Sequence, residues 1–293
     1  MASRKPLVVA NNTIQEMPAG DVADLGSLGL SGPLGGFRNR LVNPGFRVNQ
    51  RNYGGAAVAN GTYCHDRWRA GQNGGATYTV NAAAGGPDTY AVISGGTLQQ
   101  AIEAIAVEGG TYTLSWGGSS LARLTYTTAG SQTTTAYAAS PIVVAGVTAN
   151  TQVTVEFYFN APSGSVINPQ FEAGPIATTF ERRPITIETM LCYRYFRAFD
   201  YRISPYFDTA VASVFGYLYF DVGCDMRATP SIAYADDGGT AGQIALIGPA
   251  GAVNARVPAY TASATVRTAT ISAYTQSRNA HGCSCTLNAE ITT

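Results

Sequence analysis

The sequence predicts an all-β protein with an extended N-terminal arm, a jelly-roll β-sandwich, a short linking helix and a second, small antiparallel β-sandwich. Three observations lead to this prediction. Charged residues make up only 12% of the chain, against about 25% in average soluble proteins. Short apolar–polar alternations recur along the chain, and clusters of Gly, Asn and Ser separate them. The length of 293 residues corresponds to two domains of about 100–200 residues each.

The predicted arm covers residues 1–36, whose composition differs from that of the rest. Residues 6–10 can form one short strand. The Gly-rich stretch at 26–36 cannot bury enough apolar surface to fold by itself. Two interpretations stay open: a flexible linker, and an arm that becomes ordered against another chain.

The predicted jelly roll covers residues 37–185. Its clearest strand is 153–159, where alternate residues are apolar and share one face: Val153, Val155, Phe157 and Phe159. Residues 110–116 alternate in the same way, with Tyr112, Leu114 and Trp116 on one face. We expect further strands at 76–82, 89–94, 121–127 and 141–147. This spacing is typical of a two-sheet antiparallel sandwich.

A linking helix is predicted within residues 186–198, with its periodic part at 187–196. Thr186 can cap its start, and Pro184 stands just before it. Residues 199–293 then form the predicted second β-domain. Its expected strands are 215–222, 231–235, 243–247, 261–274 and 283–291.

Composition excludes several functional classes. The formal net charge is zero and no basic patch stands out, so we expect no nucleic-acid partner. No apolar run approaches the ~18 residues that a membrane-spanning helix needs, and the N-terminus lacks the apolar core of a secretory signal. We therefore expect synthesis in a cytoplasm, with reduced thiols at all five cysteines. Partners would be recognised by shape, hydrogen bonding and stacking, as neutral sugars and many proteins are.

The chain shows no catalytic signature. Phosphate-binding and dinucleotide fingerprints and the nucleophile elbow are absent from the sequence. Glycoside hydrolysis needs two carboxyl groups placed about 5–9.5 Å apart, and carboxylate pairs are scarce here. We expect neither an enzymatic activity nor a cofactor.

The best-marked polar–aromatic cluster is Asp66-Arg67-Trp68. One interpretation is a sugar that stacks on Trp68 and bonds to its two neighbours. The favoured alternative is structural, with Trp68 in the sandwich core and the polar pair holding nearby backbone, because tryptophan buries a large area.

Other candidates for glycan binding lie in the second β-domain. Asp236 and Asp237 precede two glycines, which is a turn signal, although a loop tip of this kind can also bind a cation or sugar hydroxyls. Tyr206 and Tyr234 are candidates for an exposed binding surface, because tyrosine supplies stacking area and a hydroxyl.

Two further groups of residues have alternative interpretations. His281, Cys283 and Cys285 resemble soft metal ligands, but zinc sites usually place two to four residues between paired cysteines. We favour small core residues on one strand face and expect no metal. On the helix, Leu191, Tyr193 and Tyr195 are candidates for a subunit interface.

Three stretches carry a likeness to a known family. They are LVNPGFRVNQR at 41–51 with YCHDRW at 63–68, FERRP at 180–184 with LCYRYF at 191–196, and FDVGCDMRATP at 220–230. In this order they resemble the carbohydrate-binding-module-like jelly roll and the C-terminal tip domain of fibres and head spikes of tailed bacteriophages or phage-like particles. That family helix commonly carries Gln where Tyr193 stands.

The resemblance implies a homotrimeric virion fibre or spike subunit that binds host-surface polysaccharide. It also implies attachment to other virion proteins through the arm, at Pro6, Leu7, Val8 and Val9. Assembly in the host cytoplasm and location in the virion follow from it. An alternative is a purely structural decoration or baseplate adaptor protein. A glycan depolymerase is less favoured, because the chain lacks a β-helix repeat.

Overall fold

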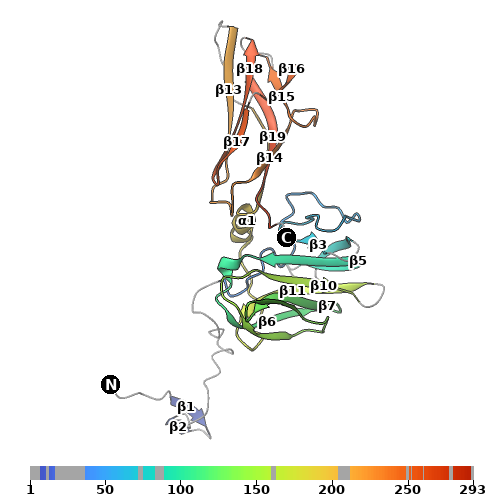
Figure 1. The fold of residues 1–293 in the computed structure, drawn as a ribbon, viewed down its shortest axis with the longest axis vertical. Coiled ribbons are helices and arrows are strands. Elements are labelled where there is room, and N and C mark those ends of the chain that lie inside the picture. Colours follow the sequence, from blue (N-terminus) through green and yellow to red (C-terminus); the bar gives the residue numbers. More distant parts are fainter. Residues whose placement is uncertain are drawn as a thin grey trace, which may run out of the picture.

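The computed structural model describes residues 7–10, 13–16, 37–71, 75–82, 89–159, 163–203, 212–248, 251, 253–259, 261–276 and 280–291. The described chain is mostly β, as predicted, with one short α-helix. Figure 1 shows this helix, α1 (Ile185–Tyr193), between a first β-region and a second β-region. Each β-region has its own main hydrophobic core.

The first β-region is one antiparallel sheet of nine strands. Seven of them follow the order β8-β7-β10-β5-β11-β6-β9, and β3 and β4 also pair with β5. Their bounds are β3 (Arg69–Ala70), β4 (Ala76–Ala82), β5 (Thr89–Ile102), β6 (Gly110–Gly117), β7 (Leu121–Thr128), β8 (Ser131–Thr134), β9 (Ile142–Val147), β10 (Val153–Tyr158) and β11 (Gly164–Ala173).

The long strand β5 makes this sheet curl into two layers. Its first half pairs with β4 and β11, whereas its second half pairs with β3 and β10. The change of pairing partners along β5 occurs at Gly96, which has φ 65°. A Cβ atom there would lie 1.6 Å from the carbonyl oxygen of Gly75, so only glycine fits this bend.

Side chains from both layers fill the space between them. Trp68 lies 4.8 Å from Phe46 between ring centroids, and Trp116 meets Phe157 edge-on at 5.3 Å. Tyr112 stacks on Phe171 at 4.9 Å. These rings belong to one continuous core, so the curled sheet is an antiparallel sandwich.

The alternating strands were predicted well. Val153, Val155 and Phe157 on β10 are fully buried, and β6 buries its expected apolar face. Phe159 lies just beyond β10 and is partly buried against the core. Strands β3, β8 and β11 and the second half of β5 were not predicted from the sequence.

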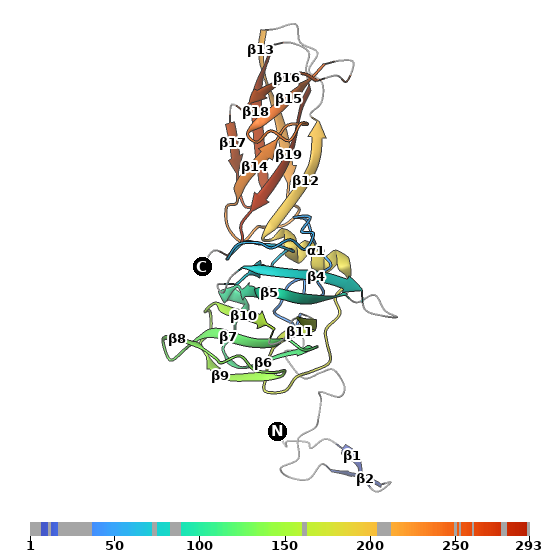
Figure 2. The ribbon, with the colours of Figure 1, turned by 90° about the vertical axis from the view of Figure 1, so that its right-hand side faces the viewer.

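The second β-region is a smaller antiparallel sandwich of two sheets (Figure 2). One sheet has the order β12-β19-β15-β16, with β14 also on β19, and the other has the order β13-β18-β17. The bounds are β12 (Phe196–Ile203), β13 (Ala212–Asp221), β14 (Ser231–Ala235), β15 (Gln243–Ile247), β16 (Val253–Pro258), β17 (Thr261–Ala264), β18 (Thr268–Gln276) and β19 (Ala280–Asn288). Leu218 and Phe220 of β13 share a core with Cys283 and Leu287 of β19.

Two predictions for the second β-region were wrong. The single strand expected at 261–274 is a hairpin of β17 and β18. The hydroxyl of Thr265 accepts hydrogen bonds from the backbone N–H of Arg267 and of Thr268, and this closes the turn. The last strand, expected at 283–291, is β19 and begins three residues earlier.

The helix α1 also differs from its prediction. It begins at Ile185, so Thr186 lies inside it, and Pro184 occupies the cap position without a side-chain cap bond. Tyr195 lies beyond its end, and its buried positions are Glu188 and Cys192. In the described part of the chain, no helix has both the length and the apolar character needed to cross a membrane.

In the N-terminal arm, β1 (Leu7–Ala10) and β2 (Thr13–Glu16) form an antiparallel hairpin. The sequence predicted one strand here, and the second strand, β2, was not predicted. Pro6 and residues 17–36 lie outside the described residues.

Candidate functional site

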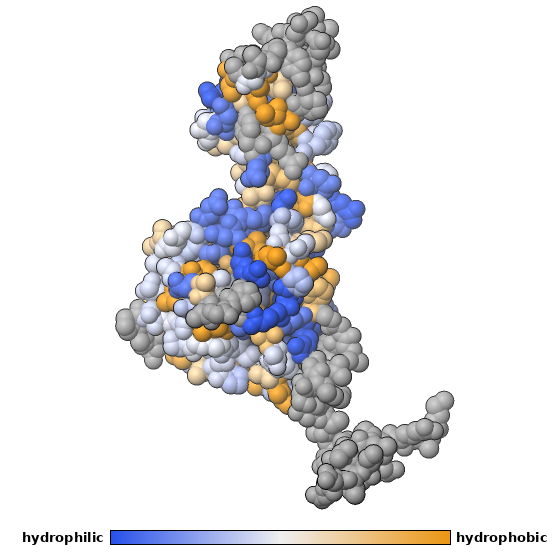
Figure 3. All heavy atoms as spheres, turned by 180° about the vertical axis from the view of Figure 1, so that it is seen from behind, coloured by the Kyte–Doolittle hydropathy of each residue, from blue (hydrophilic) through white to orange (hydrophobic). Residues whose placement is uncertain are grey.

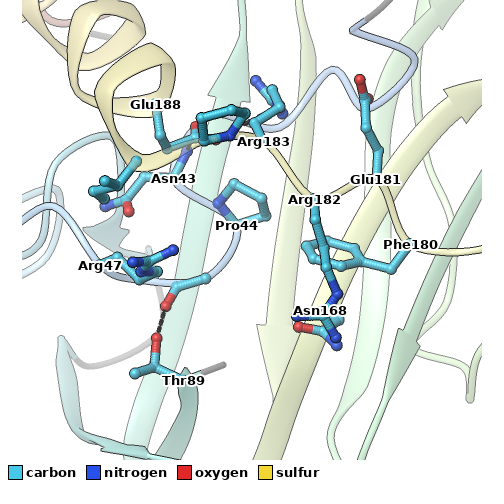
Figure 4. A pocket seen from close by; sticks show the side chains of 13 residues that line it. Asn43, Pro44, Arg47, Thr89, Asn168, Phe180, Glu181, Arg182, Arg183 and Glu188 are labelled. Atoms are coloured by element: carbon cyan, nitrogen blue, oxygen red, sulfur yellow. Dashed lines mark hydrogen bonds and ion pairs between the residues drawn. The ribbon is translucent and has the colours of Figure 1, made fainter. Parts of the chain in front are cut away.

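A cavity of about 300 Å³ lies where the loop that opens the first β-region meets the segment leading into α1 (Figure 4). Residues 43–47 form one wall and residues 180–185 form the other. Thr89 of β5, Asn168 of β11 and Glu188 of α1 complete the lining. Two of the stretches that carry the family likeness, distant in sequence, therefore meet at one cavity.

Asn43 shapes the first wall. It is buried, with φ 56°, a conformation that asparagine tolerates better than most residues. Its side-chain amide donates to the carbonyl oxygens of Val48 (2.8 Å) and Asp66 (3.0 Å), and its side-chain oxygen accepts from the N–H of Val48 (3.0 Å). The indole N–H of Trp68 donates to the Asn43 carbonyl at 2.8 Å. The core thus holds this loop in place.

Arg183 and Glu188 connect the second wall to the first. Glu188 accepts a hydrogen bond from the backbone N–H of Asn43 and lies 3.5 Å from the guanidinium of Arg183. Arg183 also donates to the carbonyl oxygens of Asn39 (3.1 Å) and Leu41 (2.5 Å). Burial raises the pKa of Glu188 above its ordinary value, although Arg183 opposes this shift. Both walls are therefore fixed before any ligand arrives.

The cavity has polar side chains at its exposed rim and includes the half-buried ring of Phe180 in its lining. Arg47 and Arg182 are exposed, and Figure 4 shows them on opposite sides of Pro44. The hydroxyl of Thr89 donates to the carbonyl of Gly45. Side chains that form hydrogen bonds thus surround an apolar surface, which is the usual composition of a small-ligand site.

The structure places the Asp66-Arg67-Trp68 cluster in the interior, with all three side chains buried. Trp68 belongs to the core of the first β-region. Asp66 accepts from the backbone N–H of Gln50 (2.7 Å) and from its side-chain amide (2.6 Å). A buried indole cannot stack on a sugar, so we retain the structural interpretation and no longer propose these residues for glycan binding.

Arg67 instead connects the two β-regions. It forms an ion pair with Glu290 and donates to the carbonyl of Ala101. Its guanidinium lies 3.6 Å from the ring centroid of Tyr195, whose hydroxyl donates to Glu103 at 2.9 Å. Figure 3 shows hydrophilic residues gathered around this junction. Tyr195 is therefore buried within the chain and not available as a subunit interface, in contrast to its prediction.

The other two interface candidates are half-buried. The ring of Tyr193 lies 3.7 Å from the guanidinium carbon of Arg197 and packs against the second core. Leu191 lines a separate cavity beside α1. Of the arm residues, Leu7, Val8 and Val9 lie in β1.

Asp236 and Asp237 stabilise a turn of the second β-region. Asp236 accepts hydrogen bonds from the N–H groups of Gly238 (2.8 Å) and Thr240 (2.9 Å). Asp237 forms two bonds of 2.9 Å with Arg256. Tyr234 is half-buried against the second core, and Tyr206 lies outside the described residues. Asp236, Asp237 and Tyr234 do not line the cavity.

Both histidines and four of the five cysteines are buried, whereas Cys224 is half-buried. Cys283 and Cys285 are buried in the second core, and His281 is buried beside them on β19. His65 contacts the Tyr78 hydroxyl through its Nδ1 atom at 2.7 Å, and burial lowers the pKa of His65 to about 4. Among the described residues, no three His, Cys, Asp or Glu side chains come together as metal ligands.

The residues at the cavity rim were not predicted from the sequence. Arg47 and Arg182 lie inside stretches that carried the family likeness, so that likeness could have pointed to them. Thr89 and Asn168 gave no such signal, because only the fold brings their strands to this place.

Comparisons with solved structures find distant likeness to two β-rich proteins. No protein-family model and no curated protein sequence matches the chain. The tandem CBM22 domains of Xyn10C from Paenibacillus barcinonensis align at 10% identity and TM-score 0.26, over 82% of this chain and 90% of theirs. Discoidin II from Dictyostelium discoideum aligns at 9% identity and TM-score 0.21, over 94% of this chain and 100% of its own.

Proposed function

We propose that this protein binds a cell-surface glycan in the cavity between residues 43–47 and 180–185. The observation that supports this most is the lining of the cavity, which combines Arg47, Thr89 and Arg182 with the half-buried ring of Phe180. A saccharide offers hydroxyls at its edges and C–H groups on its faces, so it needs both kinds of contact.

The walls of this cavity are already in place, which favours binding. Asn43 and the Arg183–Glu188 pair hold both walls through buried contacts, so little order has to be gained when a ligand enters. A cavity of about 300 Å³ accommodates a small part of a polysaccharide. We expect weak binding at each site, and several linked copies would raise the avidity.

The sequence resemblance extends this proposal to a non-enzymatic fibre or spike subunit of a virion. In this proposal each chain contains a jelly roll, and three copies of the chain form a homotrimer. The arm with Leu7, Val8 and Val9 attaches the trimer to other virion proteins. Sedimentation equilibrium at micromolar concentration tests the assembly. A trimer is expected, and a stably folded monomer would contradict it.

A purely structural adaptor is the second candidate, and one exposed face favours it. Tyr217 and Tyr219 of β13 are 46% and 68% exposed, and their ring centroids lie 6.5 Å apart. Tyrosine is enriched at protein interfaces. An image of the whole particle with both β-regions enclosed by other proteins would support this candidate.

A cavity-filling variant tests the glycan proposal. A Cβ atom at Gly45 would meet its nearest neighbour, the side chain of Arg47, at 3.6 Å, an ordinary contact. Gly45→Trp should therefore fold and fill the cavity. Gly54→Trp is the matched control, because a Cβ there has nothing within 4 Å and Gly54 lies outside this cavity.

The readout is a glycan array probed with the full-length chain. We expect binding by the wild type and by Gly54→Trp, and loss of binding in Gly45→Trp. Equal binding by all three proteins would place the site elsewhere. No binding by the wild type would refute the proposal.

A further inference from the structure

We propose that Tyr217 and Tyr219 of strand β13 form the contact between copies of this chain, close to the axis that relates the copies. This inference rests on the homotrimer proposed above and names the surface through which it assembles. Of the residues predicted for a subunit interface, Tyr195 is buried within the chain and Tyr193 packs against the second core. An interface needs an exposed face, and β13 provides one.

Strand β13 is apolar on both of its faces, unlike its neighbour β18. On β18, buried alanine and isoleucine alternate with threonine and serine. On β13, Leu218 and Phe220 point into the second core, and the residues that alternate with them are Tyr217 and Tyr219, which are 46% and 68% exposed. A continuous apolar run of this kind is typical of a strand that is covered on both faces. The outer face of β13 therefore fits a strand that is covered in the assembled protein.

Strand β13 is also an edge strand. It spans Ala212–Asp221 and, in the described part of the chain, pairs only with β18. Figure 1 shows it along one flank of the second β-region. A long apolar edge promotes association with other chains, so natural proteins cover or interrupt such edges. Because the two exposed tyrosines lie on this same strand, one partner can cover both the face and the edge.

The surroundings of the two tyrosines are uncharged, which suits contact with an identical copy. Cross-strand pairing places four hydroxyl side chains in the same rows, those of Thr261, Ser263, Thr270 and Ser272. Homo-oligomers have closed symmetry, so a residue close to the axis meets the same residue of the other copies. A charge at such a position would repel its own copies. The nearest carboxylate on β13, that of Asp221, stands at the strand end and accepts from the N–H of Gly223 at 2.8 Å.

Tyrosine supplies the contacts that such an interface needs. The ring centroids of Tyr217 and Tyr219 lie 6.5 Å apart, so together they offer one continuous aromatic surface. Tyrosine buries a large area and loses little side-chain entropy, and it is enriched in interfaces between proteins. Around an axis, the rings of neighbouring copies pack against one another as an aromatic cluster.

The test is the sedimentation equilibrium of the full-length chain and its variants at micromolar concentration. Tyr219→Lys and Tyr219→Glu each place a charge on the face. Ile176→Lys is the matched control, because Ile176 is 72% exposed, close to the 68% of Tyr219, and lies in the first β-region. Circular dichroism and urea unfolding show whether each variant keeps its fold.

We expect trimers of the wild type and of Ile176→Lys. Tyr219→Lys and Tyr219→Glu should each raise the concentration needed for assembly by roughly tenfold or more, because like charges meet at the axis. High salt should restore part of the assembly. A mixture of the two variants should assemble better than either alone, because opposite charges then meet. A variant that had only lost its fold would not be rescued by mixing.

A crosslinking variant tests the same contact with little change to the surface. Tyr219→Cys, treated with a short bismaleimide, should give covalent dimers, because the introduced thiols of neighbouring copies lie close together at the axis. The wild type is the blank, since four of its five cysteines are buried and Cys224 is half-buried. Ile176→Cys should give no more covalent dimer than this blank.

Four results would overturn the inference. If both charged variants assembled as well as the wild type, the homotrimer would stand with its interface elsewhere. If they stayed trimeric and lost binding on the glycan array, the face would belong to the glycan. If Tyr219→Cys crosslinked no better than Ile176→Cys, Tyr219 would lie far from the axis. A monomeric wild type would refute both the homotrimer and the inference.

Discussion

Arg67 of the first β-region and Glu290, just after the last strand of the second, form a buried ion pair that joins the two regions. Their side chains are 1% and 2% exposed. Glu290 also pairs with Arg51 at 3.3 Å, and the guanidinium of Arg51 lies 3.7 Å from the ring centroid of Phe196. Arg67 and Glu290 lie 223 residues apart in sequence, so their charges compensate each other only in the folded chain.

Breaking this pair should destabilise the whole chain. Glu290→Ala leaves the charge of Arg67 buried and uncompensated, which typically costs about 3–5 kcal/mol. Urea unfolding, followed by tryptophan fluorescence and circular dichroism, measures the change. Asp225→Ala at the exposed Arg267–Asp225 pair is the control and should leave stability nearly unchanged. Similar losses in both variants would contradict a special role for the junction.

The bend in β5 should tolerate only glycine. Gly96→Ala places a Cβ atom 1.6 Å from the Gly75 oxygen at φ 65°, so backbone must move and we expect a loss of at least about 2 kcal/mol. Gly54→Ala meets no atom within 4 Å and should be neutral. Chemical denaturation compares the two. Full stability of Gly96→Ala would disprove the bend.

Trp68 should matter for stability because it fills the core of the first β-region. Trp68→Ala removes contacts with Phe46 and Phe157 and should cost about 3–5 kcal/mol. Thermal and urea unfolding measure this loss. A folded Trp68→Ala protein that has lost less than about 1 kcal/mol would indicate that the indole is exposed after all.

His65 should make stability depend on pH. Burial lowers its pKa from 6.5 to about 4 in the folded chain, so between these values the unfolded chain binds more protons. The contribution of neutral His65 to the free energy of unfolding is therefore complete above about pH 6.5. It is lost as the pH falls toward 4, and the loss amounts to up to roughly 3 kcal/mol. His65→Gln, which cannot titrate but can bond to Tyr78, should flatten this part of the profile. If the stability of wild type and variant changed with pH in parallel, the pH dependence would not come from His65.

Much of the fold could be predicted from local pattern. The alternation in β10 and β6 identifies both strands and their buried faces, because side chains in a strand alternate between faces. Strand β5 was cut short because Gly95 and Gly96 look like a strand end, whereas they mark the change between layers. The hairpin of β17 and β18 was missed because its turn contains no glycine or proline.

The candidate site was less predictable, because it depends on contacts between distant parts of the chain. The structural interpretation favoured for Asp66 and Arg67 agrees with their burial, but their partners, such as Gln50 and Glu290, could not be identified from the sequence. Tyr195 was predicted as an interface residue because the sequence does not show that it packs on Arg67 within the same chain. The stretches 41–51 and 180–184 were noticed, but only the fold shows that they share a cavity.

The location of a bound glycan tests the account most directly. The full-length chain is mixed with a saccharide that it binds, made with a photoactivatable group, and the crosslinked peptides are identified by mass spectrometry. We predict adducts on the peptides that contain residues 43–47 and 180–185. Adducts confined to the face of Tyr217 and Tyr219, or to the turn at Asp236 and Asp237, would contradict it.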